Sequence, residues 1–376
     1  MPSIWSYSDY SDRGYGLFKR RIFREMEKLG WTTILAEASL DDPEAKPFLR
    51  EHLFSHPSDW ILLINQSTAQ LAQYLSVPPG RTPLPGKKLI WYLDDPRFFI
   101  DRPFQQEEYV FSFDETYIDC IRRFNPTHCG FWPLAADCEE PGRYDPTLAC
   151  QICFVGGLID QSERRAQLSP DLLAYVEHLV ELQFQHRDKS FYQLAEEYPY
   201  APGKMITITP QVAHYLYWEA NNRYRIRTLE ALMDFDLRIY GNEDWEKLLS
   251  GSPLLECFCG PADPVKELPH IFASANINLN IHSIQCRGSL NQRDFNAPVA
   301  GGFLLSDWVP AAGKYFQPGV EAVYWNDVEN LRAKIAYYLD HPAECRSAVE
   351  RGRRRVLKDH TYKQRVRQLL QTLQLY

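Results

Sequence analysis

Along the first 140 residues, stretches with apolar side chains at helical spacing alternate with short apolar runs that are typical of strands. Residues 17–29 place apolar side chains at helical spacing, and the helix that they predict ends at Gly30. Short, nearly continuous apolar runs lie at 32–38, 60–66, 89–95 and 109–114. Such runs are typical of strands that are buried on both faces of a parallel sheet. This half of the chain is therefore predicted to form an α/β domain.

A polar segment rich in proline and glycine, residues 137–149, separates this half from a second one. An apolar run at 150–157 opens the second half, and a long helical region follows to about Met233. Further strands are expected at 237–241, 255–260, 277–283, 303–307 and 322–325, and two helices at about 328–339 and 343–358. We predict one domain over 1–140, a second over 150–360, and a C-terminal tail over 361–376. Each domain is expected to be a doubly wound, Rossmann-like sheet, and the two are expected to face a cleft.

Composition excludes several classes of protein. With 376 residues the chain is too long for one ordinary core, which agrees with two domains. The net charge of −8 does not favour nucleic-acid binding. We find no secretory signal and no apolar run of the ~20 residues that a membrane helix requires. The protein is therefore expected in the cytoplasm, with its nine cysteines as thiols. Cys150-x-x-Cys153 lacks a second pair at zinc spacing, so no metal site is predicted.

Two glycines end the apolar run that opens the second half. Gly156 and Gly157 follow this predicted strand, and Arg165 lies in the next helical stretch. Glycines let the backbone approach a phosphate, and exposed N–H groups can hold it. A purely structural turn between strand and helix is the alternative, since the chain has neither a GxGxxG nor a Walker sequence.

Residues 276–282 carry polar side chains at every second position. On a strand Asn276, Asn278, Asn280 and His282 would share one face, which helices normally cover in a doubly wound sheet. An edge strand or a hydrogen-bonded polar ladder would explain the pattern equally well. A ligand site would use the carboxyl end of the strand, where Asn280 and His282 lie.

A predicted helix follows the polar strand and ends at Gly301. Ser289 and Gln292 fit a capping box, with Ser289 as the N-cap. The positive end of the helix would then meet the carboxyl end of the strand and favour an anion. Arg287 and Arg293 lie near that end and would add charge-assisted hydrogen bonds to a phosphate. Together these features predict a diphosphate-sized site.

Several stretches of the second half resemble the C-terminal domain of CgeB-like (spore maturation protein-like) glycosyltransferases, a branch of the GT-B group-1 transferases. They are CFVGGLIDQSERR (153–165), IYGNEDW (239–245), ASANINLNIHS (273–283), RDFNAPVAGGFLLSD (293–307), YFQPGVEAVYWNDVENLRAKIAYYLDHP (315–342) and GRRRVLKDHTYKQR (352–365). In the first half WYLDDP (91–96) and PLAAD (133–137) match more loosely. The resemblance implies a GT-B fold and a nucleotide-sugar donor held mainly by the C-terminal domain. It also implies an acceptor, of unknown kind, held by the N-terminal domain, and no cofactor beyond the nucleotide-sugar substrate.

Carried over residue by residue, the resemblance places Gly156 and Gly157 by the donor phosphates and Arg293 at the head of the donor-binding helix. The family usually has Glu where this chain has Asn296, and that Glu holds the donor ribose hydroxyls. Gly288 stands eight positions earlier, where a two-glutamate motif would have its first Glu. Asn can bond a hydroxyl but carries no charge. The donor and the stereochemistry of transfer therefore stay open.

Asp94 and Asp95 end an apolar strand in the first half. A carboxylate there could act as general base on an acceptor hydroxyl, or it could cap the next turn. A metal–diphosphate site of the GT-A kind is a third interpretation, against which the predicted two-sheet organisation argues. Further cleft candidates precede the first helix: Ser8, Asp9, Asp12, Arg13 and Gly14.

The sequence thus predicts a glycosyltransferase whose helix N–H groups and arginines stabilise the departing diphosphate. Two alternatives stay open. One is a non-catalytic binding or assembly protein of the same fold, which Asn296 favours. The other is a sugar-nucleotide epimerase of the same fold, which would need no acceptor.

Overall fold

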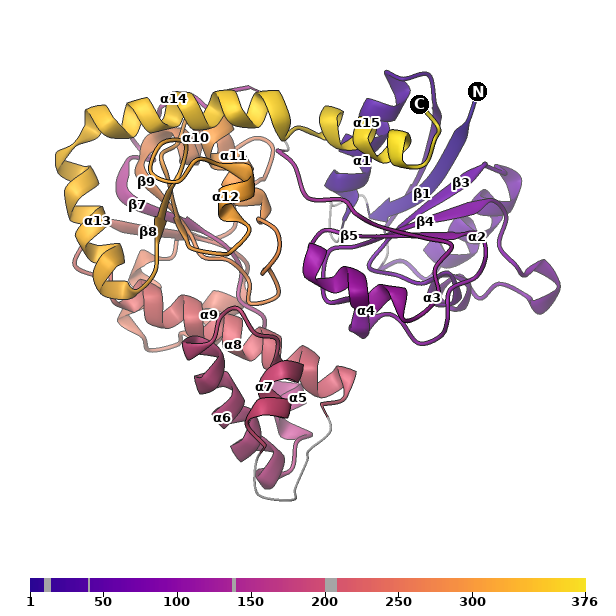
Figure 1. Ribbon diagram of the computed structural model, residues 1–376, viewed down its shortest axis with the longest axis horizontal. Helices are drawn as coiled ribbons and strands as arrows, with labels where there is room; N and C mark the ends of the chain where they lie inside the picture. Colours follow the sequence, from indigo (N-terminus) through magenta and orange to yellow (C-terminus); the bar gives the residue numbers. More distant parts are fainter. Residues whose placement is uncertain (10–14, 40, 137–139, 200–207) are drawn as a thin grey trace. The chain divides into compact units, whose positions relative to one another are not determined.

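The computed structural model describes residues 1–9, 15–39, 41–136, 140–199 and 208–376 (Figure 1). The chain divides into two compact units. The first comprises Met1–Asp137 with Thr361–Tyr376, and the second comprises Cys138–His360. The segment 361–376, expected as a tail, contains the helix α15 (Tyr362–Thr372) and belongs to the first unit.

A six-stranded parallel sheet forms the centre of the first unit, with the strand order β2-β1-β3-β4-β5-β6. The strands are β1 (Ser3–Asp9), β2 (Thr32–Ala38), β3 (Trp60–Ile64), β4 (Lys87–Tyr92), β5 (Glu108–Ser112) and β6 (His128–Phe131). The helices are α1 (Gly16–Glu27), α2 (Ala45–Ser55), α3 (Thr68–Tyr74), α4 (Ile118–Arg122) and α15, with the 3-10 turns η1 (Pro79–Arg81), η2 (Pro96–Phe98) and η3 (Glu115–Tyr117). Every residue of β3 is buried, as its unbroken apolar run predicts.

Helix α15 is fixed to the first unit by buried hydrogen bonds across more than 200 residues of chain. The indole Nε1 of Trp132 donates to the carbonyl oxygen of Arg365 at 2.9 Å. The guanidinium Nε of Arg365 donates in turn to the carbonyl oxygen of Leu134 at 3.0 Å. Because an unpaired polar group is costly in a buried place, these bonds hold the end of the chain in this unit.

A five-stranded parallel sheet forms the centre of the second unit, with the strand order β11-β10-β9-β7-β8. The strands are β7 (Cys150–Val155), β8 (Leu237–Tyr240), β9 (Ala275–Asn280), β10 (Leu304–Asp307) and β11 (Val323–Trp325). The helices are α5 (Ser162–Ala166), α6 (Pro170–Gln185), α7 (Phe191–Glu197), α8 (Pro210–Glu230), α9 (Asp244–Leu248), α10 (Leu268–Ser274), α11 (Gln292–Ala300), α12 (Ala312–Tyr315), α13 (Val328–Asp340) and α14 (Pro342–Asp359).

The strand predicted at 255–260 is wrong. The chain there forms a 3-10 helix, η4 (Pro253–Cys257), and Phe258 makes only an isolated bridge to Ile239. The reason is local, because Ser252 caps the turn through Leu254 N–H and Pro253 stands at the first helical position. Proline fixes φ near −65°, which suits a helical start.

Both sheets contain a point where the order of strands reverses. In the second unit the chain passes from β7 to β8 on one side and then returns to β9 on the other side of β7. In the first unit the corresponding point lies between β1 and β3. Open α/β sheets bind ligands outside the carboxyl ends of their strands at such a point. A ligand site is therefore expected at this point in each unit.

Candidate functional site

Two adjacent asparagines of α8 hold the loops that leave β7 and β9. Asn222 accepts from Ile159 N–H at 3.1 Å and donates to the Ile159 carbonyl at 2.7 Å. Asn221 donates to Ser283 Oγ at 2.9 Å and accepts from Ile284 N–H at 2.7 Å. Both asparagines are buried, so these bonds fix the two loops that flank the switch point of the second unit.

Arg225 lies one helical turn further along α8 and reaches the same place. Its side chain is buried, and its Nη1 donates to the Gly157 carbonyl. The buried Nε has no hydrogen-bond partner among the described residues. Burial, and then the charge of Arg293, lower the pKa of Arg225 to about 9. The guanidinium therefore lacks a counter-charge that would offset its burial.

Arg293 occupies the first turn of α11, next to the carboxyl end of β9. Its Nε donates to Asn280 Oδ1 at 2.9 Å, and its Nη2 to the Ile281 carbonyl at 3.3 Å. Burial lowers the pKa of Arg293, against the opposing effect of Asp294 and Asp307. Two guanidinium groups, from α8 and α11, thus meet at the ends of β7 and β9.

His282 follows β9 and lies between two carboxylates. Its Nδ1 is 2.5 Å from Asp307 Oδ1, and its Nε2 is 2.8 Å from Asp294 Oδ2. Burial lowers the pKa of His282, but Asp294 and Asp307 more than offset this and raise the pKa to about 10. Since both ring nitrogens face carboxylate oxygens, both donate, and the imidazole is positively charged at neutral pH.

Asp307 joins this cluster to a third arginine. Its Oδ2 accepts from Arg187 Nη2 at 2.8 Å, and the Arg187 guanidinium lies 3.7 Å from the centroid of the Tyr224 ring. Burial is the largest single effect and raises the pKa of Asp307, but the charge and hydrogen bonds of His282, together with the charge of Arg187, outweigh it, so that the pKa is lowered overall. We name the following residues the switch-point cluster, in which four cations face two carboxylates: Arg187, Arg225, His282, Arg293, Asp294 and Asp307. The excess of positive charge suits a dianion such as a diphosphate.

The predicted cap of α11 is wrong. The N-cap is Asn291, whose side chain accepts from Arg293 N–H at 2.9 Å, while Asp294 accepts from Asn291 N–H at 3.1 Å. Ser289 is fully buried instead, with its Oγ 3.3 Å from Tyr315 Oη. Asp294 also binds His282, so the capping box belongs to the cluster. Helix α11 ends at Gly301 as predicted, in the left-handed conformation at φ 96°.

The other predicted donor-site residues lie in different surroundings. Arg165 is half exposed on α5 and pairs with Glu177 at 3.0 Å, so the structure does not bring it to the switch-point cluster. Arg287 is buried, and its Nη1 donates to Tyr217 Oη at 3.4 Å. Asn296 is partly buried on α11, three residues after Arg293 and therefore on the same side of the helix.

The glycines after β7 fit the interpretation as a structural turn. Gly156 accepts from Trp245 Nε1 at 2.8 Å, and a Cβ on Gly157 would lie 2.7 Å from Asn242 Oδ1. Close packing therefore accounts for the absence of side chains. The Gly157 N–H, in contrast, has no hydrogen-bond partner within the described ranges, and its carbonyl meets Arg225. This N–H belongs to the residue whose carbonyl accepts from Arg225, and it could donate to a phosphate.

Asp94 follows β4, and its side chain reaches Asn65 and Tyr15, which follow the two strands on either side of the switch point of the first unit. Its Oδ2 accepts from Asn65 Nδ2 at 2.5 Å and from Tyr15 Oη at 3.1 Å. Asn65 Oδ1 also accepts from Leu93 N–H at 2.7 Å, which fixes the loop after β4. Burial, and then the charge of Asp94, raise the pKa of Tyr15, so its hydroxyl stays protonated. The arrangement holds a carboxylate in one orientation at the carboxyl ends of β3 and β4.

Asp95 has a different role from its neighbour. It is fully buried, pairs with Arg97 at 2.5 Å and accepts from Arg97 N–H as the cap of η2. Asp9 is buried at the end of β1, where its carbonyl accepts from Ser8 Oγ at 3.2 Å. The remaining candidates, Asp12, Arg13 and Gly14, lie outside the described residues.

The described residues contain neither a candidate metal site nor a candidate membrane span. No group of three or more His, Cys, Asp or Glu side chains there could hold a metal ion. No helix in those ranges is long and apolar enough to cross a membrane.

The comparisons with known proteins agree with this architecture. Residues 222–371 match a family described as glycosyl transferase-like, while the comparison with curated proteins gave no match. A sucrose-phosphate synthase from Thermosynechococcus elongatus is similar in structure, with a TM-score of 0.60 and 11% identity over 100% of this chain and 98% of that one. Anabaena HepE in complex with UDP-glucose has a TM-score of 0.56 and 9% identity, with both chains covered in full. The chain has the GT-B fold.

A third structure of similar fold is a glycosyltransferase from Rickettsia africae, with a TM-score of 0.54 and 10% identity over 100% of this chain and 98% of that one. At such identities the likeness concerns the fold alone. The two doubly wound sheets predicted from the sequence are thereby confirmed.

Sequence reasoning missed the contribution of α8. For this part of the chain we predict a long helical region to about Met233, in which Arg165 is the candidate site residue. The signal was nevertheless present, because Asn221, Asn222 and Arg225 lie close together in the stretch WEANNRYRIR (218–227). Asn221 and Asn222 lie four and three positions before Arg225, which is the spacing of neighbours on a helix surface. Three buried polar side chains at that spacing need partners.

Proposed function

We propose that the protein is a glycosyltransferase that uses a nucleotide-activated sugar and holds its diphosphate at the carboxyl ends of β7 and β9. The observation that carries this proposal is Arg225, a buried guanidinium with an unpartnered Nε beside Arg293 and the Gly157 N–H. The glycosyl transferase-like match over residues 222–371 supports it, since that range includes Arg225 and α11. The UDP-glucose complex of HepE, a protein of the same fold, is consistent with such a donor.

The proposed chemistry is the stabilisation of a leaving group. When the bond between the sugar and the diphosphate breaks, negative charge develops on the diphosphate oxygens. Arg225, Arg293 and the Gly157 N–H would donate to these oxygens, and the charged His282 would add a fixed positive charge below them. Preorganised donors in a dry site stabilise such charge more than water does. The proposal includes no metal ion, because the arginines supply the positive charge.

For the acceptor we propose Asp94 as the general base. It is held by Asn65 and Tyr15 in a fixed orientation, and a base must be positioned before its pKa matters. Asp95, in contrast, is engaged by Arg97, which favours the capping role. The acceptor itself is not specified by these residues.

Calorimetric titration with UDP, GDP, ADP and dTDP tests the donor site. We expect one of them to bind, and Arg225→Met to weaken that binding by about 10- to 100-fold, the value of one or more hydrogen bonds to a charged group. Arg227→Met is the matched control, because Arg227 lies on the same helix but pairs with Glu181 at 2.7 Å. Absence of binding by all four diphosphates, or equal loss in both variants, would contradict the proposal.

A non-catalytic protein of the same fold is the second candidate, and Asn296 is the observation that favours it. Turnover of a panel of sugar nucleotides separates the two, because a binding protein would bind a donor without consuming it. Conversion of the donor sugar without any acceptor would instead indicate an epimerase. Asn296→Glu restores the carboxylate usual in the resembled family, and a gain in turnover would show that Asn296 limits the reaction.

A further inference from the structure

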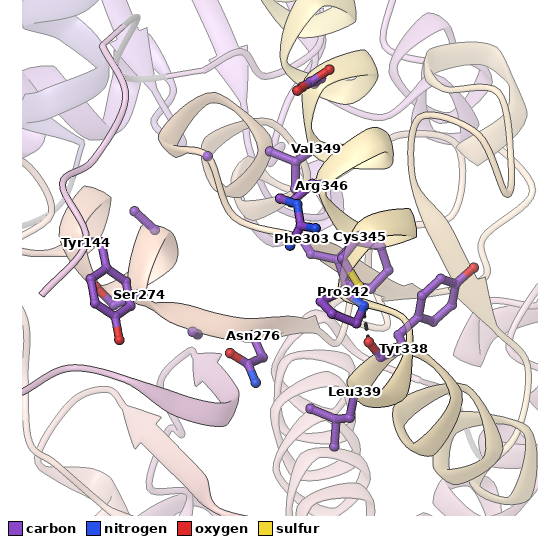
Figure 2. A pocket seen from close by; sticks show the side chains of 14 residues that line it. Tyr144, Ser274, Asn276, Phe303, Tyr338, Leu339, Pro342, Cys345, Arg346 and Val349 are labelled. Atoms are coloured by element: carbon purple, nitrogen blue, oxygen red, sulfur yellow. Dashed lines mark hydrogen bonds between the residues drawn. The ribbon is translucent and has the colours of Figure 1, made fainter. Parts of the chain in front are cut away.

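A cavity lies at the opposite edge of the same sheet from the switch-point cluster. It has a volume of about 510 Å³ and lies beside the amino ends of β9 and β10 (Figure 2). Residues from α10, α13 and α14 complete its wall. Ligand pockets for small molecules measure roughly 300 to 1,000 Å³. The cavity is therefore large enough for a small molecule, and it shares no residue with the donor site proposed above.

Aromatic side chains form much of this wall. Phe303 and Tyr338 form a tilted pair with ring centroids 4.7 Å apart. Figure 2 shows Tyr144 on the other side of the cavity, and its side chain is 67% exposed. Phe303 is buried and Tyr338 partly buried, so the exposed ring of Tyr144 and the ring of Tyr338 offer flat apolar surface on two sides of the cavity. Such walls suit a ligand with a flat, apolar body.

Two polar side chains at the cavity are available to a ligand. Arg346 on α14 and Asn276 at the start of β9 are both exposed, and both line the cavity. Within the described ranges neither side chain forms a hydrogen bond or an ion pair. Both can donate hydrogen bonds, and a guanidinium binds a carboxylate with two parallel bonds. The polar part of the site therefore favours an acidic group, whereas Glu350, one turn beyond Arg346, would disfavour it.

Cys345 argues for binding rather than covalent chemistry. Its thiol lies 3.4 Å from the Tyr338 carbonyl, and burial raises its pKa to about 11. A thiol in this state is not a nucleophile near neutral pH, because the reactive form is the thiolate.

We propose that this cavity binds a small amphipathic molecule with a flat, apolar body and one acidic group, which is held by Arg346 and Asn276. The body lies between Tyr144 and the Phe303–Tyr338 pair. The ligand does not compete with a nucleotide sugar, because β9 separates Asn276 at its amino end from Asn280 at its carboxyl end.

Anilinonaphthalene sulfonate is a suitable probe, because it combines a flat aromatic body with a fixed negative charge. We expect its fluorescence to report one saturable site on the full-length protein, unaffected by saturating UDP. Arg346→Gln should weaken binding about tenfold, and Asn276→Trp should abolish it by filling the cavity. Arg354→Gln, on the same helix but away from the cavity, should leave the affinity unchanged, and Glu350→Gln should not weaken it.

Three results would overturn this proposal. One is weak binding at many sites that Asn276→Trp does not change. The second is displacement of the probe by UDP, which would assign it to the donor site. The third is tighter binding of a naphthalene trimethylammonium salt than of the sulfonate, with that binding lost in Glu350→Gln. This result would mean that the ligand is a cation and not an anion. None of these results depends on whether the protein transfers sugars, since the altered side chains lie outside the switch-point cluster.

Discussion

Replacement of His282 by glutamine should destabilise the protein in a way that depends on pH. The imidazolium lies between Asp294 and Asp307, with less than 2% of its surface exposed. Glutamine keeps a polar side chain of similar size but cannot carry a positive charge. In the variant, two buried carboxylates would therefore face each other without the cation that separates them.

The magnitude follows from the pKa of the histidine. It rises from 6.5 to about 10 on folding, and each tenfold change in proton affinity corresponds to about 1.4 kcal/mol, so the protonated form contributes on the order of 5 kcal/mol. A pKa that is raised in the folded state gives stability that is fully present below pH 6.5. This stability is lost as the pH rises from 6.5 to about 10. The penalty of His282→Gln should accordingly be largest at about pH 6 and shrink towards pH 10.

Urea denaturation, followed by circular dichroism between about pH 6 and pH 10, measures this penalty. His178→Gln is the matched control, because His178 is exposed on α6. If the two units unfold in separate steps, only the step that responds to the substitution enters the comparison. A penalty that stays constant across this pH range, or the absence of any penalty, would refute the assignment of a charged His282.

Three further substitutions have expected outcomes. In the first unit, burial lowers the pKa of Lys19 from 10.5 to about 7, so wild-type stability should rise as the pH increases from about 7 to 10.5. Lys19→Met should stabilise the protein against urea by a few kcal/mol at pH 7, and the stability of this variant should rise less with pH. Gly302→Ala should lower the melting temperature, because its Cβ would lie 2.3 Å from Asn278 Nδ2. Asn222→Ala should cost about 2 kcal/mol by removing both bonds to Ile159, and should weaken nucleotide binding in the same preparation.

Elements whose sequence pattern depends on burial alone could be predicted from the sequence. The apolar runs that became β3, β4 and β5 are buried on both faces of a sheet, so their hydrophobicity is continuous and visible. The glycine that ends α11 was also predictable, because its left-handed conformation is a local property.

Features that depend on contacts between distant segments could not be predicted from the sequence. Arg225 and the Gly157 carbonyl are 68 positions apart, and nothing in either local sequence indicates the other. The capping-box pattern predicts an N-cap at Ser289, but Asn291 and Asp294 fit the same pattern. In the structure Asn291 also binds Asn280, and Asp294 also binds His282. Asp294 therefore serves the helix and the site at once, and only the fold shows this.

The proposed function requires that a diphosphate binds between α8 and α11 at the carboxyl ends of β7 and β9. A crystal structure of the full chain, soaked with whichever nucleoside diphosphate binds in the calorimetric titration, tests it most directly. We expect phosphate density within hydrogen-bond distance of the Gly157 N–H and of the guanidinium groups of Arg225 and Arg293. Density for the nucleotide at any other place, including the cavity beside Phe303, would contradict it.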